Sequence, residues 1–402
     1  MLPEKFTLAD RVLQVPPSPT LAVNAKAKAL RAAGADILNF SVGEPDLSTP
    51  AHVCEAGKQA IDAGHTRYTP VAGILELREA VCDRFKKAQG WEYTPDQVQV
   101  SCGGKHGLYN VFQAILNPGD EVLIPAPYWV SYPPMVQLAG GTPVVVPLTE
   151  ESNFDLDPAT LAQYVTRRTK AIILNSPSNP TGAVYSQASL EAVAKMAFDN
   201  GWLVISDDMY EELSYAEGKI AHILHADPRL QGQTVLSNGV SKSFAMTGWR
   251  IGYSVGPIEV IKAMNKIQSQ STSNPAAPSQ YAALAALTGP QDFPGQLREA
   301  FLPRRAFFVR ELRSIAGVTC VNPMGAFYVF PNFSAYYGKT FGGKIIDGSV
   351  ALADYFLSEA KVATVPGAAF GADNFIRFSF ATSMAVIEKG MERIKHALAA
   401  LQ

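Results

Sequence analysis

The stretch TVLSNGVSKSFAMTGWRIGYSV, Thr234 to Val255, holds one lysine between two short apolar runs. The runs Thr234 to Ser237 and Ile251 to Val255 are rich in aliphatic residues, which is typical of buried strands. Lys242 lies between them among Gly, Val, Ser, Phe, Ala and Met. A lysine in a loop is ordinarily solvated, but burial lowers the pKa of an amine and allows it to form an imine. Lys242 is therefore a candidate nucleophile.

Further short apolar runs precede this stretch and alternate with segments of helical periodicity. The expected strands are Val98 to Ser101, Glu121 to Pro125, Pro143 to Pro147, Ala171 to Asn175 and Trp202 to Ser206. The expected helices include Gly104 to Leu116, Trp129 to Ala139 and Gln187 to Asn200. Such alternation indicates crossover connections, so we predict an α/β fold with a mainly parallel seven-stranded sheet flanked by helices.

The pattern changes after about Asn274. We expect a long helical region to about Ala316, strands at Val318 to Val321, Phe327 to Phe330 and Ile376 to Phe380, and helices near Gly348 to Ala360 and from about Met384. These elements predict a second, smaller α+β domain. The expected boundaries are 1–47 for an N-terminal segment that packs with the small domain, 48–285 for the large domain and 286–402 for the small domain.

Composition describes an ordinary globular chain and excludes several classes of protein. The 402 residues carry a net charge of -2 and are 47% hydrophobic, so nothing favours nucleic acid as a partner. The four cysteines form no CxxC pair, and His222 and His225 lack further ligands nearby, so no metal site is predicted. The N-terminus is not typical of a signal peptide, and no apolar run reaches the roughly 20 residues of a membrane span. We expect a soluble, cytoplasmic protein.

Small and polar residues gather where the expected strands end. They are Gly103-Gly104, the Asn179-Pro-Thr-Gly182 turn, Asp207, Ser241-Lys242 and, before the last strand of the sheet, Arg250. Ligands of open α/β sheets bind outside the carboxyl ends of the strands. We therefore expect these residues to meet at one rim of the sheet.

The stretch Ser237 to Tyr253 resembles the signature S-x-x-x-S-K-x-F-x-M-x-G-W-R-x-G-Y of class I aminotransferases of fold type I, which depend on pyridoxal phosphate (PLP). The resemblance runs from SVGEPD (Ser41 to Asp46) to FIRFSFA (Phe375 to Ala381). In between it includes RYTPVAGILELREAV, GGKHGLYNVFQAILNPGDEVLIPAPYWVSY, NSPSNPTGAVYS, ISDDMYEEL and GAFYVF. Bacterial-type aspartate aminotransferases are the most similar members. The resemblance implies a large PLP-binding domain and an enzyme that transfers amino groups.

The resemblance implies roles for the residues that face the cofactor ring. Lys242 forms the Schiff base to PLP, and a carboxylate keeps the ring nitrogen protonated. Asp207 and Asp208 are alternatives for that carboxylate because neighbours on a strand face opposite ways. The family pattern D-x-x-Y favours Asp207, which it pairs with Tyr210.

Other positions match groups that contact the rest of PLP. Asn179 and Tyr210 match the donors to the phenolic oxygen, and Trp129 matches the residue that stacks on the ring. Backbone amides of Gly103, Gly104 and Lys105 at a helix start, together with Ser241 and Arg250, are expected to bind the phosphate. Tyr68 matches a tyrosine that reaches the phosphate of the neighbouring subunit, which implies a homodimer with shared sites.

Substrate recognition follows from the same resemblance. Arg377 is expected to bind the α-carboxylate, because a planar guanidinium suits that group and an arginine among apolar residues requires a partner. Gly43 lies where the chain passes close to the substrate, and Trp129 and Asn179 are expected beside it. Lys105 and Thr20 match positions that hold the distal carboxylate of aspartate.

The implied reaction is ping-pong amino transfer from aspartate to 2-oxoglutarate, with Lys242 as the base at Cα. Prephenate, aromatic or alanine aminotransferases and a β-elimination lyase stay open as alternatives of the same fold. A non-enzymatic PLP sensor is a further alternative, although such proteins carry an added DNA-binding domain.

Overall fold

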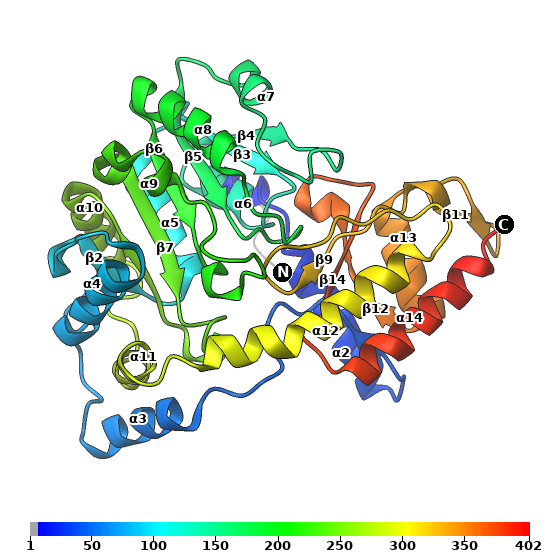
Figure 1. Cartoon of the computed structure of the whole chain (residues 1–402), viewed down its shortest axis with the longest axis horizontal. Helices are drawn as coiled ribbons and strands as arrows, with labels where there is room; N and C mark the ends of the chain where they lie inside the picture. Colours follow the sequence, from blue (N-terminus) through cyan, green and yellow to red (C-terminus); the bar gives the residue numbers. More distant parts are fainter. Residues whose placement is uncertain (1–6) are drawn as a thin grey trace.

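The computed structural model describes residues 7–402, so the first six residues of the predicted N-terminal segment lie outside it. The larger part of the molecule is built on one seven-stranded sheet (Figure 1). Its strands are β2 (Val98–Ser101), β3 (Glu121–Ala126), β4 (Thr142–Pro147), β5 (Thr169–Asn175), β6 (Leu203–Asp207), β7 (Thr234–Gly239) and β8 (Gly252–Val255). Their order is β2-β8-β7-β6-β5-β3-β4, and only β8 runs antiparallel to its neighbours. The predicted seven-stranded, mainly parallel sheet is confirmed.

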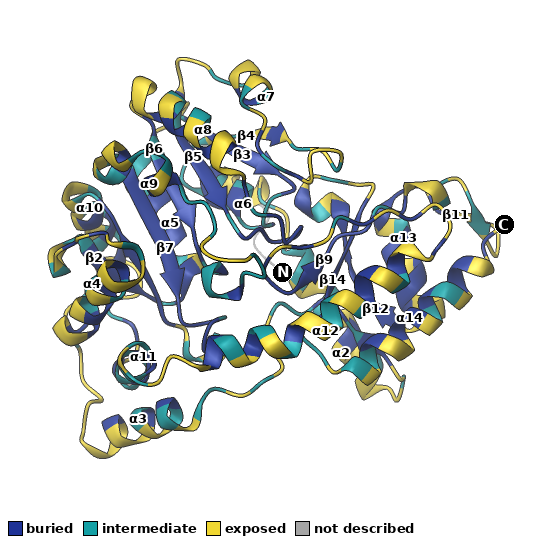
Figure 2. Cartoon of the chain, in the orientation of Figure 1, coloured by how far each residue is buried: buried dark blue, intermediate teal, exposed yellow. Residues whose placement is uncertain are grey.

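Both faces of this sheet are buried except at the edge strand β4, which explains the continuous apolar runs of the inner strands. In β5, Ile172 and Leu174 belong to one core cluster, and Ala171 and Ile173 belong to the cluster on the opposite face. The alternation follows the two-residue period of a strand. Figure 2 shows the strands buried and the outer sides of the covering helices exposed.

The helices of this part lie before, between and after the strands. They are α3 (Ala51–Asp62), α4 (Leu75–Gln89), α5 (Gly104–Ile115), α6 (Tyr132–Leu138), α7 (Pro158–Gln163), α8 (Gln187–Asn200), α9 (Ile223–Ala226), α10 (Ile258–Ser269) and α11 (Ala277–Thr288). Local sequence sets several ends. Ser186 caps the start of α8 by accepting from the Ser189 amide, and Gly201 ends it with φ 65°. The helix expected from Trp129 begins only at Tyr132, with prolines in its first turn where their missing N–H groups are tolerated.

The smaller part combines the C-terminal third with the N-terminal segment. Its helices are α2 (Pro19–Ala32), α12 (Phe293–Arg313), α13 (Ser349–Tyr355) and α14 (Met384–Ala399), whereas the short helix α1 (Asp10–Leu13) lies against α6 of the larger part. Its strands are β1 (Leu38–Asn39), β9 (Tyr328–Val329), β10 (Thr340–Phe341), β11 (Lys344–Ile345), β12 (Val362–Ala363), β13 (Val365–Pro366) and β14 (Ile376–Ser379). The strand β1 pairs with β12, and β13, β14 and β9 form a three-stranded antiparallel sheet.

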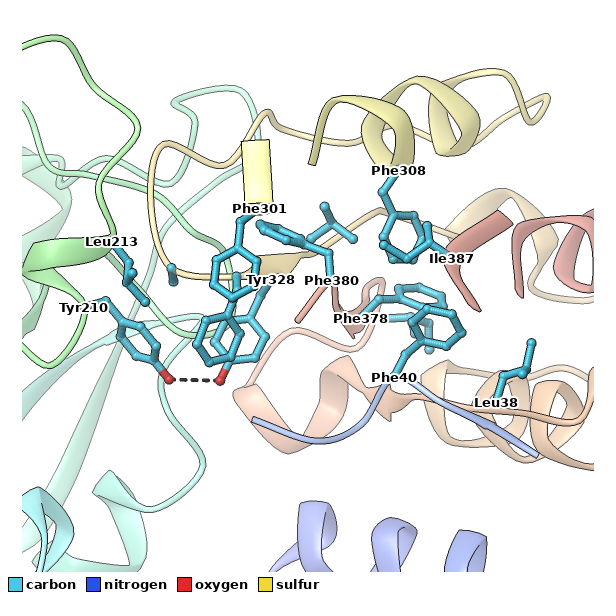
Figure 3. Packing of buried hydrophobic residues seen from close by; sticks show 14 of the residues in the cluster. Leu38, Phe40, Tyr210, Leu213, Phe301, Phe308, Tyr328, Phe378, Phe380 and Ile387 are labelled. Atoms are coloured by element: carbon cyan, nitrogen blue, oxygen red, sulfur yellow. Dashed lines mark hydrogen bonds between the residues drawn. The ribbon is translucent and has the colours of Figure 1, made fainter. Parts of the chain in front are cut away.

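Aromatic packing joins the N-terminal segment to this part. The ring of Phe40 lies edge-on to Phe308 of α12, with centroids 5.6 Å apart, and contacts Phe378 of β14 (Figure 3). The helix α12 runs between the two parts (Figure 1). This packing is consistent with the expected boundaries at 47 and 285, which stay a prediction.

One expectation for the C-terminal third is wrong. The region Val318 to Val321 is not a strand; only an isolated bridge joins Thr319 to Asn332. The expected long helical region consists of two helices, because Gly289 ends α11, Pro290 follows it and α12 begins at Phe293. The error concerns a short element whose local pattern is weak.

Candidate active site

A cavity of about 360 Å³ opens at the carboxyl ends of the sheet strands, between the two parts of the molecule. Residues from distant segments line it. Of the predicted site residues these are Thr20, Gly43, Gly104, Lys105, Trp129, Asn179, Asp207, Tyr210, Ser241, Lys242, Arg250 and Arg377. Gly103 lies directly behind Arg250, and Tyr68 lies away from the cavity with 92% of its surface exposed.

Lys242 follows β7 and places its amine in the cavity. Its Nζ donates a 2.6 Å hydrogen bond to the carbonyl oxygen of Gly43. Burial lowers the pKa of Lys242 to about 8, although the nearby Glu44 carboxylate favours the charged form. About a tenth of the amine is therefore unprotonated at pH 7, far more than for an ordinary lysine, and a nucleophile or a base requires this form.

Asp207 ends β6 as a buried acid with a strong donor. The Tyr132 hydroxyl donates to its Oδ2 at 2.6 Å, and the Asn175 side chain donates to its carbonyl oxygen at 2.9 Å. Burial raises the pKa of Asp207 to about 6, against the opposing effect of the Tyr132 hydrogen bond. The carboxylate is thus suited to pair with a cationic group that enters the cavity.

Asp208, the alternative acid, does not line the cavity. Its carboxylate accepts from Ser206 Oγ at 2.6 Å and lies 3.3 Å from His222 Nε2. The two acids face opposite ways, as alternation along a strand requires.

The start of α5 and Arg250 form a compact, anion-binding corner. The first amides of a helix have no acceptor inside it, and Gly104 is the first residue of α5. Arg250 has φ 57° and is held by the carbonyl oxygens of Thr247 and Cys102, at 2.9 and 3.2 Å. A Cβ at Gly103 would lie 2.4 Å from Arg250 Nη2. Glycine at this position therefore lets the guanidinium approach the start of the helix.

Arg377 on β14 is a buried cation. Its Nη1 donates to Asn179 Oδ1 at 2.9 Å and its Nη2 donates to the carbonyl oxygen of Ser41 at 2.8 Å, while Nε has no partner among residues 7–402. Within the same range no carboxylate pairs with it, and burial lowers its pKa. A buried charge without a counter-ion is unfavourable. The guanidinium is therefore placed to bind an anion that enters the cavity.

A second free cation lies elsewhere on the cavity wall. Lys105 Nζ lies 4.9 Å from the centre of the Trp129 ring, and no hydrogen bond joins it to another side chain in the described part of the chain. Burial, and then the nearby Arg250, lower the pKa of Lys105. Thr20, on α2, completes this wall and hydrogen-bonds Ser18.

Eleven of the described residues on the cavity wall were not predicted as site residues, and three of them contact residues that were. Tyr132 binds Asp207, Asn175 accepts from the Asn179 amide at 2.8 Å, and Tyr328 lies against Arg377. Each lies within a segment that carried the family resemblance. Their roles depend on contacts between segments far apart in the sequence, so no local pattern marked them.

Comparison with known proteins identifies the family. A family model for aminotransferases of class I and II matches residues 35–394. This chain belongs to that family. An aspartate aminotransferase of Geobacillus stearothermophilus is 48% identical to this chain over 387 residues, which cover 96% of this chain and 98% of the relative. An aspartate/prephenate aminotransferase of Cereibacter sphaeroides is 51% identical over 397 residues, 98% and 99% of the two chains.

Solved structures show the same fold. The aspartate aminotransferase of Thermus thermophilus with maleate superposes with a TM-score of 0.91 at 44% identity, covering 98% of this chain and 100% of that one. The predictions of a fold type I transaminase and of PLP as its cofactor are confirmed. No helix among residues 7–402 is long and apolar enough to cross a membrane, and no cluster of metal-ligating side chains occurs in that range.

The cavity of the aminotransferase fits PLP on its own chemistry. It offers an amine of lowered pKa, a buried acid, and a corner of helix amides and guanidinium for a phosphate. The close approach of β8 to α5 supports that corner, since a Cβ at Gly252 would lie 2.2 Å from the Gly104 nitrogen. Only glycine at this position keeps the helix start where it is.

Proposed function

We propose that this aminotransferase moves the amino group of aspartate to 2-oxoglutarate in a ping-pong cycle. One observation carries the proposal: besides Arg250, which is assigned to the phosphate, two further cations without acidic partners among residues 7–402, Arg377 and Lys105, line the same cavity as Lys242. A dicarboxylic amino acid presents one carboxylate for each cation, and charge-assisted hydrogen bonds are the stronger ones in proteins. Monocarboxylic substrates would leave Lys105 without an anion.

PLP, when bound, supplies an electron-withdrawing ring that stabilises negative charge at the substrate Cα. Asp207 would hold the proton of the ring nitrogen, Trp129 would pack on the ring, and Asn179 and Tyr210 would donate to the phenolic oxygen. The phosphate would be held by a set of five residues: Gly103, Gly104, Lys105, Ser241 and Arg250. In this assignment Lys105 acts through its backbone amide, so its side chain stays free for the substrate.

Lys242 then acts as the base of the reaction. The pKa of the Lys242 amine, about 8, lies close to neutral pH. The amine can therefore both accept the Cα proton and return it. Arg377 fixes the α-carboxylate and thereby orients the Cα–H bond. Asn179, bonded to Arg377 at 2.9 Å, links substrate binding to the cofactor side of the cavity.

Prephenate is a second candidate substrate. The relative from Cereibacter sphaeroides is named for both aspartate and prephenate, and it is 51% identical to this chain. Prephenate also carries two carboxylates, so the same pair of cations suits it. We retain it as an activity of the same cavity rather than as a separate function.

A homodimer completes the proposal. Tyr68 lies in an extended segment between α3 and α4 and is 92% exposed, an unusual state for a large aromatic side chain. We propose that it reaches the phosphate of the partner's site. The four cysteines are free thiols, which suits the reducing cytoplasm that we propose as the location.

The deciding experiment measures oxaloacetate formed from aspartate and 2-oxoglutarate by the purified, PLP-loaded protein. We expect turnover in the wild type and a loss of several orders of magnitude in Lys242→Ala. A donor panel with alanine, phenylalanine and the amino acid made from prephenate ranks the substrates. Faster turnover of monocarboxylic donors than of aspartate would contradict the proposal.

A further inference from the structure

Tyr328 of β9 touches the residues proposed for both halves of the site. Its side chain is buried, and its hydroxyl lies 2.9 Å from the hydroxyl of Tyr210 (Figure 3). The guanidinium carbon of Arg377 lies 4.5 Å from the centre of the Tyr328 ring. One phenol therefore contacts the proposed carboxylate site through its ring and the proposed cofactor site through its oxygen.

The backbone around Tyr328 is shaped to keep its hydroxyl in this place. A Cβ at Gly43 would lie 2.7 Å from the Tyr328 oxygen, so glycine leaves the space that the hydroxyl needs. The carbonyl oxygen of the same glycine accepts from Lys242 Nζ. Within β9 and β14, Tyr328 pairs with Ser379, two residues from Arg377, which fixes the ring beneath the guanidinium.

Either hydroxyl can donate across the 2.9 Å contact between the two phenols. Arg377 lies against the Tyr328 ring and favours loss of the Tyr328 proton, so it strengthens Tyr328 as a donor. When Tyr328 donates to Tyr210, the Tyr210 proton is free to point elsewhere. No other hydrogen-bond partner holds the Tyr210 hydroxyl among residues 7–402.

We propose that Tyr328 is a positioning residue that couples carboxylate binding at Arg377 to hydrogen-bond donation by Tyr210. The inference rests on the proposed function, in which Tyr210 donates to the phenolic oxygen of PLP. Free Arg377 strengthens donation by Tyr328, and hydrogen bonds in a chain polarise one another. A bound carboxylate neutralises Arg377 and weakens both donations.

The sign of the effect can be measured in the PLP-loaded protein. A donor to the phenolic oxygen stabilises its negative charge and lowers the pH at which the visible absorbance of the bound cofactor titrates. The other ionisable groups that face the two phenols or Lys242 contribute to the same titration. They are Asp207, Arg377, Glu44, Arg250 and Tyr132. The comparison must therefore remove one hydroxyl and keep these charges.

The test compares Tyr328→Phe with the wild type, with and without maleate as a dicarboxylate probe that undergoes no turnover. We expect the titration midpoint of free Tyr328→Phe to rise by roughly half a pH unit to one unit, the equivalent of one lost hydrogen bond. Maleate should raise the titration midpoint of the wild type. It should raise the midpoint of Tyr328→Phe by less, because in this variant only the direct effect of the maleate charge on the cofactor is left.

Tyr355→Phe is the matched control. The Tyr355 hydroxyl is also buried and donates to the carbonyl oxygen of Ala397 at 2.7 Å, within the smaller part of the molecule. Loss of a buried hydroxyl should destabilise both variants to a similar extent in thermal melts, and only Tyr328→Phe should change the titration. Equal midpoints and equal maleate shifts in the two variants would overturn the inference. Absence of oxaloacetate formation by the wild type would instead overturn the proposed function.

Discussion

The hydroxyl of Tyr132 donates a 2.6 Å hydrogen bond to Oδ2 of Asp207, at the buried carboxyl end of β6. The tyrosine comes from α6 and the acid from a strand 75 residues later. The bond favours the ionised carboxylate, whereas burial disfavours it more strongly, and the resulting pKa of about 6 exceeds the ordinary value. Asp207 is therefore an acid whose charge costs stability until a cationic partner arrives.

This balance predicts a pH dependence of stability in the PLP-free protein. The folded pKa of Asp207 lies above the unfolded value near 3.8, so its favourable contribution is present at acid pH and is lost as the pH rises through about 6. Asp207→Asn cannot ionise, so this variant does not lose stability as the pH rises through about 6. Between pH 4 and pH 7 the stability of this variant relative to the wild type should rise by roughly 2 to 3 kcal/mol in urea unfolding.

Tyr132→Phe serves as the control for this prediction. Removal of the donor takes away the strongest effect that opposes burial, so the pKa of Asp207 should rise further and the loss of stability should extend to higher pH. Tyr355→Phe, which loses a bond to a neutral carbonyl group, should show no such pH dependence. Parallel stability curves for wild type and Asp207→Asn would contradict the assignment of the raised pKa.

Lys105→Gln tests the distal carboxylate site. The variant keeps the backbone amide at the start of α5 and loses the side-chain charge above Trp129. We expect kcat/KM for aspartate to fall about 10- to 100-fold, as for one lost charge-assisted hydrogen bond, while alanine is turned over at a nearly unchanged rate. Lys26→Gln, a change at an exposed ion pair with Asp354, is the control and should alter neither. Equal losses for aspartate and alanine would place Lys105 in cofactor binding alone.

Gly252→Ala tests the packing that supports the phosphate corner. The added methyl group would lie 2.2 Å from the Gly104 nitrogen, so β8 or the start of α5 must move. We expect a loss of about 1 to 3 kcal/mol in stability and weaker binding of PLP in fluorescence titrations. Gly232→Ala, where no atom lies within 4 Å of the added carbon, should leave PLP affinity unchanged. Equal PLP affinity in both variants would show that the corner does not depend on this contact.

Subunit mixing tests the proposed dimer. If Tyr68 acts in the partner's site, a mixed dimer of Lys242→Ala and Tyr68→Ala subunits contains one site with both defects and one site with neither. Refolding Lys242→Ala together with impaired Tyr68→Ala should then give more transaminase activity than either variant alone, and light scattering should report twice the monomer mass. Because Tyr68 is exposed in the single chain, Tyr68→Ala should fold normally. A mixture no more active than its components would contradict the shared site.

Much of the large sheet could be predicted from sequence because its strands, apart from the edge strand β4, are buried on both faces. Such strands appear as continuous aliphatic runs, and β2 was predicted with the bounds that the structure has. The strand order was not predictable, since it depends on pairing between segments far apart. The same limit explains the error at Val318 to Val321, where the pairs of the smaller sheet are short and non-local.

The candidate site shows a similar division. Lys242, Asp207 and Arg377 lie in local motifs, and the structure brings all three to one cavity. Tyr132 and Tyr328 act through hydroxyl groups whose partners lie 75 and 118 residues away in sequence. A tyrosine in an apolar segment is typical of any core, so only three-dimensional contacts distinguish these two.

The bond between Arg377 and the carbonyl oxygen of Ser41 joins residues 336 positions apart. During synthesis, Ser41, Lys242 and the strands of the large sheet leave the ribosome long before Arg377 does. Contacts between segments so far apart in sequence form slowly, and exposed intermediates are prone to aggregate. The nascent chain can therefore build the cofactor half of its site first, and it gains the ability to hold a substrate carboxylate only when its last strand has emerged.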